Sequence, residues 1–182
     1  MSEEGGIRPL SLVLRVLMLI VVFGFFIVMT MELFAFAEPY IFPLRMLQGQ
    51  AAYIGDNIII GPYPHRDELR RLKDKMGVVE VISLLNPDIT IESRLLDRER
   101  RNARALGIRF KSRPMSWFRL DSQANKKAAE RIARYAVFKF GRSSSKKLYI
   151  NCYLGVHRVR LVRLAIERLV KTGQAKALSK FE

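Results

Sequence analysis

Residues 148–158 read LYINCYLGVHR, and this stretch sets the arrangement of the rest of the chain. The apolar run that ends at Cys152 predicts a short buried strand, and Gly155 marks a turn after it. Arg158 then opens an amphipathic helical pattern that continues through residues 159–170. The stretch therefore predicts a strand, a thiol, a loop, an arginine and a helix, in that order.

The loop between this strand and this helix suits a phosphate dianion. A tight loop that leads into a helix N-terminus points backbone N–H groups inward and adds the positive end of the helix dipole. Arg158 supplies a planar fork that matches two phosphate oxygens. The same field favours a thiolate, because helix N-termini and cations lower a thiol pKa from ~8.5 to roughly 3.5–7.5. The phosphate-binding residues that we expect are Tyr153, Leu154, Gly155, Val156, His157 and Arg158.

Length and charge limit the classes of protein that fit. Without the apolar segment described next, about 140 residues remain, enough for one soluble domain with its own core and not for two. The chain has 32 Lys and Arg against 17 Asp and Glu, a formal net charge of +15. Its surface field therefore attracts anions such as phosphorylated substrates, anionic lipids and nucleic acids. Cys152 is the only cysteine, which excludes an internal disulfide framework.

An apolar segment near the N-terminus predicts a membrane anchor. Residues 16–31 carry no charge, and the apolar character resumes beyond Glu32 up to residue 37, enough for a tilted spanning helix of about 20 residues. A signal peptide cleaved after Ala35-Phe36-Ala37, just before Glu38-Pro39, and a buried core helix are the alternatives. We expect an N-terminal lead (1–15), a transmembrane helix or signal anchor (16–37), a connector (38–50) and one domain (51–182).

The positive charges around this segment predict its orientation. Arg8 and Arg15 precede the span, whereas Arg45 alone follows it closely. By the positive-inside rule, the short N-terminus lies in the cytoplasm and the domain on the other side. We therefore expect a single-pass protein of a bacterial inner membrane, with its domain in the periplasm.

Strand and helix patterns alternate along the domain. We expect a hairpin over residues 52–60, a turn at Gly61-Pro62-Tyr63-Pro64, core strands over 78–85 and 108–114, and the strand that ends at Cys152. Helices are expected over residues 66–76, 91–106, 122–140 and 159–170. This order predicts an α/β fold with a mainly parallel central sheet flanked by helices. Cys152 then falls at the carboxyl ends of the strands, where such sheets bind ligands.

The spacing of Cys152 and Arg158, with Gly155 between them, resembles the signature of the cysteine-dependent tyrosine and dual-specificity phosphatases. The upstream pattern is also similar to the opening of a dual-specificity phosphatase domain: Ile58-Ile59-Ile60-Gly61-Pro62, Leu69, Leu72, Gly77-Val78 and Val81-Ile82-Ser83-Leu84. The resemblance covers residues 52–170 and implies a membrane-anchored, bacterial-type member. It implies that Cys152 attacks phosphorus to give a cysteinyl-phosphate, that Arg158 holds the equatorial oxygens, and that no metal or cofactor takes part.

The resemblance also implies a general acid upstream of the cysteine, at about the distance of Asp121. Asp121 is alternatively the N-cap of the helix that starts at Ser122. Alignment on the helix start instead places Ser116, a poor acid, at that position. Nearby Trp117 and Phe118 fit either a wall of the pocket, against a phosphotyrosine ring or an acyl chain, or ordinary core packing.

Two residues beside the loop depart from the family pattern. Asn151 stands where the family commonly has histidine, and Val159 where it usually has serine or threonine. Both departures put turnover in question and leave phosphate binding intact. A catalytically weak phosphate-binding module is therefore the alternative to an active enzyme. His157 adds positive charge to the loop only when protonated, and a neutral ring facing solvent is the other interpretation.

The expected substrate is a phosphorylated protein or a phospholipid reached from the membrane. Nucleic acid is not expected, because the arginines within residues 94–104 lie on a surface helix without interleaved aromatic residues. No histidines, cysteines or paired carboxylates have metal-ligand spacing, so we expect no metal.

Overall fold

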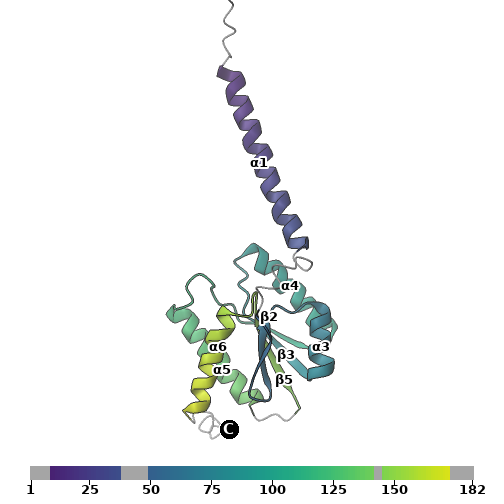
Figure 1. The fold of residues 1–182 in the computed structure, drawn as a ribbon, viewed down its shortest axis with the longest axis vertical. Helices are drawn as coiled ribbons and strands as arrows, with labels where there is room; N and C mark the ends of the chain where they lie inside the picture. Colours follow the sequence, from purple (N-terminus) through teal and green to yellow (C-terminus); the bar gives the residue numbers. More distant parts are fainter. Residues whose placement is uncertain (1–8, 38–48, 142–144, 173–182) are drawn as a thin grey trace, which may run out of the picture. The chain divides into compact units, whose positions relative to one another are not determined.

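The structure, a computed structural model, describes residues 9–37, 49–141 and 145–172. It forms two compact units, residues 1–42 and 43–182, and the first contains α1 (Pro9–Ala37). The second contains, in order, β1 (Ala52–Ile54), β2 (Ile58–Pro62), α3 (Arg66–Met76), β3 (Val78–Ser83), α4 (Thr90–Ala105), β4 (Arg109–Ser112), α5 (Gln123–Phe140), β5 (Lys147–Cys152) and α6 (His157–Lys171), as Figure 1 shows.

The strands of the second unit form one sheet in the order β1-β2-β5-β3-β4. β2, β5, β3 and β4 run parallel, and β1 pairs antiparallel with β2 through the predicted hairpin. β5 is buried from Leu148 to Cys152 because it has strands on both sides and helices over both faces. The fold is therefore α/β with a mostly parallel five-stranded sheet, as the alternating pattern predicts.

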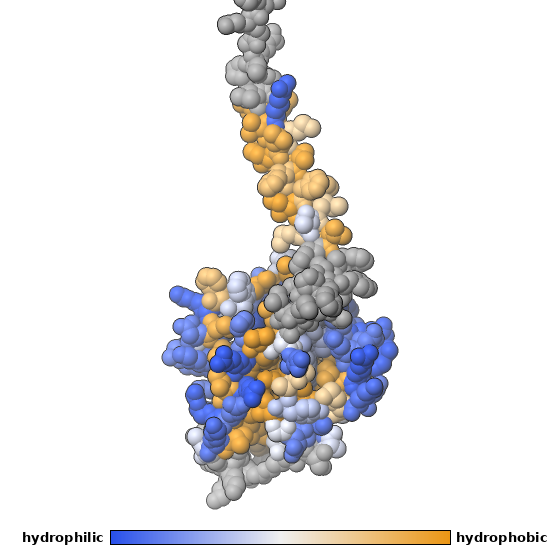
Figure 2. Space-filling view, in the orientation of Figure 1, coloured by the Kyte–Doolittle hydropathy of each residue, from blue (hydrophilic) through white to orange (hydrophobic). Residues whose placement is uncertain are grey.

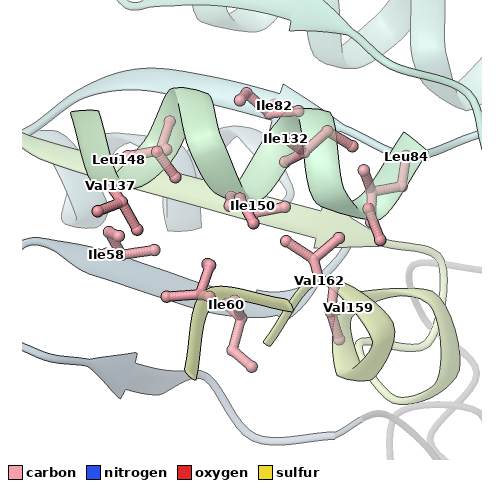
Figure 3. Packing of buried hydrophobic residues seen from close by; sticks show 14 of the residues in the cluster. Ile58, Ile60, Ile82, Leu84, Ile132, Val137, Leu148, Ile150, Val159 and Val162 are labelled. Atoms are coloured by element: carbon pink, nitrogen blue, oxygen red, sulfur yellow. The ribbon is translucent and has the colours of Figure 1, made fainter. Parts of the chain in front are cut away.

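Helices cover both faces of this sheet. On one face, α5 and α6 pack together, and Figure 3 shows Val137 beside Leu148 of β5, and Val159 and Val162 on the side of Ile150, in the largest core cluster. On the other face lie α3 and α4, whose apolar stripes include the buried Leu69. Burial of such a side chain contributes about 1.5–3 kcal/mol, so the period-3.6 stripes decide how the helices lie on the sheet.

Some expected boundaries are wrong. Gly61 and Pro62 belong to β2 and do not form a turn, because they continue the parallel pairing opposite Asn151 and Cys152. β4 is an edge strand paired with β3 alone, not the core strand expected over 108–114, and Arg109 on it is exposed. β3 ends at Ser83 and α5 begins at Gln123. Helix α3 begins and ends as predicted.

Helix α1 carries the apolar segment. Val13–Met31 has a mean hydropathy of 2.7 and is long enough to cross a membrane. All side chains over these residues that the structure describes are exposed, and Figure 2 shows their apolar surface. The same length and composition also fit a signal sequence or the core helix of a soluble protein.

Several residues on which the predicted anchor and its orientation depend lie outside the residues that the structure describes. They include Arg8 and Arg45, on which the predicted orientation rests, and Glu38 and Pro39 beside the predicted cleavage site. Most of the expected connector, residues 38–48, also lies outside it.

Candidate active site

Gly155 closes the loop between β5 and α6 tightly. Its φ is +69°, in the left-handed region that glycine enters without strain. A Cβ added there would lie 2.3 Å from the Pro62 nitrogen and 2.7 Å from the Gly61 carbonyl carbon. The loop therefore rests directly on the end of β2, and only glycine fits at this position.

The backbone N–H groups and carbonyls of this loop differ in their hydrogen bonding. Among the described residues, the N–H groups of residues 154–158 donate no hydrogen bond to another part of the chain. The carbonyls behave differently: those of Tyr153 and Leu154 accept from the N–H groups of Tyr63 at 3.3 Å and Gly49 at 2.7 Å. Because this run of donors leads into the N-terminus of α6, it has the composition of an anion nest.

Cys152 is the last residue of β5 and lies at the carboxyl edge of the sheet, as predicted. Its side chain is 2% exposed and contributes to the core cluster beneath the loop. It forms no disulfide. The thiol therefore lies within the core cluster at the end of β5.

Arg158, in the first turn of α6, is buried and held from several sides. Its Nη1 donates to Glu92 Oε2 at 2.8 Å and to the carbonyls of Leu84 at 3.1 Å and Met115 at 3.3 Å, while Nη2 donates to Glu92 Oε1. Glu92 therefore occupies the end of the guanidinium fork. Nε takes part in none of these bonds, so an oxyanion would bind along the side of the guanidinium that carries Nε.

Asn151, just before the cysteine, belongs to a buried polar cluster. Its Nδ2 donates to Glu99 Oε1, and Ser83 Oγ lies 3.3 Å from its Oδ1. Burial raises the pKa of Glu99 to about 7, against the opposing effect of the hydrogen bond from Asn151. Glu99 Oε2 is buried and accepts no hydrogen bond from any residue that the structure describes. The cluster therefore holds a carboxyl group that keeps its proton to a higher pH than an ordinary glutamate does.

The segment between β4 and α5 contacts Arg158 through the Met115 carbonyl. The buried Asn125 fixes it: its Nδ2 donates to the carbonyls of Ser116 and Arg119, both at 2.8 Å, and its Oδ1 accepts from the Ser116 N–H at 3.0 Å. The Ser116 hydroxyl accepts from the Phe118 N–H at 3.3 Å. These bonds leave Ser116 in a structural role.

Asp121 lies in the exposed turn before α5. The N-cap of α5 is Ser122, whose Oγ accepts from the Asn125 N–H at 3.3 Å, so the interpretation of Asp121 as the cap is wrong. A residue earlier in the turn cannot reach the cap geometry that Ser122 already fills. The Asp121 carboxyl makes no hydrogen bond or ion pair within the described part of the chain and remains the candidate acid.

Trp117 and Phe118 are exposed, by 56% and 77%, so core packing is the wrong interpretation for both. Their rings pack on each other edge to face, with centroids 5.8 Å apart. His157 is also exposed, in the first turn of α6, and Val159 is buried in the core.

Three residues that hold the site were missed from the sequence: Glu92, Glu99 and Asn125. The helical period gives the signal for two of them, because Glu92 and Glu99 continue the inner stripe of α4 formed by Leu95, Leu96 and Ala103. An acidic residue on an apolar stripe indicates a buried partner. Asn125 carries no comparable signal.

No group of three or more His, Cys, Asp or Glu side chains that could hold a metal occurs among the described residues. No family model matches the chain, and no curated protein sequence matches it.

Proposed function

We propose that the chain is a phosphatase that hydrolyses phosphate monoesters through a cysteinyl-phosphate, in the manner of the dual-specificity phosphatases. One observation carries the proposal: the N–H groups of residues 154–158, which have no hydrogen-bond partner among the described residues, follow the buried Cys152 in the chain and lead to Arg158. A phosphoryl group bound by these donors would present its phosphorus to the sulfur, which is the geometry that in-line displacement needs.

In the first step, Cys152 Sγ attacks phosphorus as a thiolate, the S–P bond forms, and the bond from phosphorus to the ester oxygen breaks. Asp121, protonated at this stage, donates its proton to the departing oxygen, which leaves as an alcohol. The loop amides and Arg158 stabilise the charge on the equatorial oxygens.

In the second step, water attacks the phosphorus of the cysteinyl-phosphate. Asp121, now ionised, takes a proton from the water, the S–P bond breaks, and inorganic phosphate and the thiolate are released. The chain's own part in both steps is to position the phosphoryl group and to stabilise charge.

Helix α1 supports a membrane-anchored form of this enzyme. Val13–Met31 meets the length and hydropathy of a span, and a retained anchor would keep the domain at the membrane surface. The expected periplasmic side of a bacterial inner membrane belongs to the same proposal.

A phosphate-binding module with weak turnover is the second candidate. Two observations favour it. Val159, next to Arg158, is 1% exposed in the core and offers no hydroxyl to the loop. Asn151 cannot carry charge and is bonded to Glu99.

Turnover of p-nitrophenyl phosphate by the full-length chain in detergent micelles separates the two candidates, with the near-isosteric Cys152→Ser variant as control. The enzyme proposal predicts turnover that Cys152→Ser abolishes. Calorimetric binding of inorganic phosphate without turnover above the Cys152→Ser background would support the binding module and overturn the enzyme. Absence of both would overturn both.

A further inference from the structure

The exposed aromatic pair Trp117 and Phe118 is not explained by the core or by the phosphate loop. Both rings face solvent and touch each other. Exposed Arg113 and Arg119 flank the pair, and neither guanidinium has an ion-pair partner among the described residues. Surfaces that insert into the headgroup layer of an anionic bilayer typically combine aromatic rings with arginines in this way.

The pair is held close to the proposed active site. Met115, two residues before Trp117, accepts a hydrogen bond from Arg158 Nη1 at 3.3 Å through its carbonyl. The Met115 N–H donates to the Leu84 carbonyl at 3.1 Å, at the carboxyl edge of the sheet. Asn125 then fixes the backbone on either side of the two rings. The aromatic pair therefore has a defined position at the edge of the sheet that carries Cys152.

The chain from α1 also reaches the domain at this edge. The Gly49 N–H donates to the Leu154 carbonyl at 2.7 Å, so the first described residue after the connector touches the phosphate loop. α1 ends at Ala37, and residues 38–48 separate it from Gly49. The phosphate loop is therefore only a short stretch of chain away from the candidate span.

We propose that the edge of the domain around Cys152 rests on the surface of the membrane that holds α1, with Trp117 and Phe118 in its interfacial layer, and that the substrate is a lipid phosphate monoester presented there. The substrate class rests on the proposed phosphatase activity, whereas the membrane contact does not. Two exposed rings also fit a pocket wall for a phosphotyrosine ring, but the flanking arginines and the net charge of +15 complement an anionic membrane surface.

Trp117 is the only tryptophan of the chain, so its fluorescence reports the contact directly. The test uses the full-length chain reconstituted into phosphatidylcholine and phosphatidylglycerol vesicles, with or without bromine on the acyl chains near the headgroups. The proposal predicts blue-shifted emission that brominated lipid quenches. Emission typical of water and equal in both kinds of vesicle would overturn it.

A matched control moves the reporter away from the site. Phe138 is 53% exposed near the far end of α5, on the order of 20 Å from the start of that helix at 1.5 Å per residue. In the double variant Trp117→Phe, Phe138→Trp, the proposal predicts emission that brominated lipid does not quench. Equal quenching at both positions would mean that the protein adheres to lipid without a defined edge, and would overturn the proposal.

Activity on two substrates tests the substrate class. The probes are phosphatidic acid in the same vesicles and soluble p-nitrophenyl phosphate, with a phosphotyrosine peptide for comparison. For Trp117→Ala, Phe118→Ala, we expect release from phosphatidic acid to fall about tenfold and p-nitrophenyl phosphate turnover to change less than about twofold. Hydrolysis of the peptide but not of phosphatidic acid would overturn the lipid substrate. Failure of the phosphatase proposal can be distinguished from failure of the membrane contact. In the first case the p-nitrophenyl phosphate turnover would not exceed that of Cys152→Ser, while the fluorescence experiment would still test the membrane contact.

Discussion

Arg158 and Glu92 form a buried two-point ion pair that joins the start of α6 to the start of α4. Glu92 also accepts the Asn86 N–H at 2.7 Å, which fixes the carboxylate itself. The arginine proposed to bind phosphate is thus fixed in place before any ligand enters. Glu92 is a positioning residue, because it acts through the guanidinium.

The variant Glu92→Gln tests this role. Loss of one partner from a buried ion pair leaves the other charge uncompensated, and we expect a loss of unfolding free energy of about 3 kcal/mol. A guanidinium displaced by a fraction of an ångström should also lower kcat on p-nitrophenyl phosphate, by up to about 100-fold. Chemical denaturation and steady-state kinetics of the full-length chain in micelles measure both. The exposed Glu130→Gln on α5 is the control, and equal kinetics for the two variants would contradict a positioning role.

Gly155→Ala should abolish phosphate binding and turnover. The substitution adds strain at positive φ and a Cβ only 2.3 Å from the Pro62 nitrogen, so the loop must move. Gly55→Ala is a matched control, because Gly55 has a φ of +61° and nothing within 4 Å of the added Cβ. We expect backbone strain to lower the unfolding free energy of both variants by about 1 kcal/mol, and only Gly155→Ala to lose activity. Calorimetric binding of inorganic phosphate makes the comparison, and retained binding in Gly155→Ala would show that these amides are not the site.

Local periodicity predicts the strands and helices that surround the site, but it does not predict which of them lie side by side in the sheet. The apolar run before Cys152 and the stripe after Arg158 correctly predicted β5 and α6, because each signal lies within a dozen residues. The strand order, and with it the edge position of β4, depends on pairing between distant segments. Arg109 exposed on β4 was the local hint, since a charged residue in a short strand is typical of an edge.

Glu99 should make stability depend on pH. Its pKa is about 7 in the folded chain against 4.5 for an ordinary glutamate, so the folded state holds the proton more tightly. The stabilisation from that proton is fully present below pH 4.5 and is lost as pH rises to about 7, a decrease in unfolding free energy on the order of 3 kcal/mol. Glu80 changes nothing in this range: burial alone would raise its pKa, but hydrogen bonds from Tyr135, Lys139 and Arg109 outweigh burial and lower it to about 2.

Glu99→Gln removes this titration and keeps the size of the side chain. Denaturant unfolding of the wild type and the variant at pH values from 5 to 8 should give curves that diverge below pH 7, because only the wild type gains stability on acidification. Parallel curves would show that Glu99 does not titrate in this range. The buried cluster escaped sequence prediction because Glu99 stands among many charged residues of α4, and only its place on the inner stripe sets it apart.

Asp121→Asn tests the general acid. A carboxyl that protonates the leaving oxygen contributes about 10²- to 10⁴-fold, so we expect at least a 100-fold lower kcat on an alkyl phosphate. The loss should be smaller on p-nitrophenyl phosphate, whose leaving group needs little protonation. Ser122→Ala serves as the comparison, since removal of the α5 cap should lower stability by about 1 kcal/mol without this dependence on the leaving group. An Asp121→Asn enzyme with unchanged rates on both substrates would rule out Asp121 as the acid.

The covalent intermediate on Cys152 is the most direct test of the account. Trypsin cleaves after Lys147 and Arg158, so residues 148–158 are released as a single peptide that contains the only cysteine. After the full-length chain is mixed with substrate, denatured within milliseconds and digested, mass spectrometry should find this peptide carrying one phosphoryl group on Cys152, and never in Cys152→Ser. Phosphate release by the wild type with the peptide unmodified at every time point would contradict the cysteinyl-phosphate mechanism.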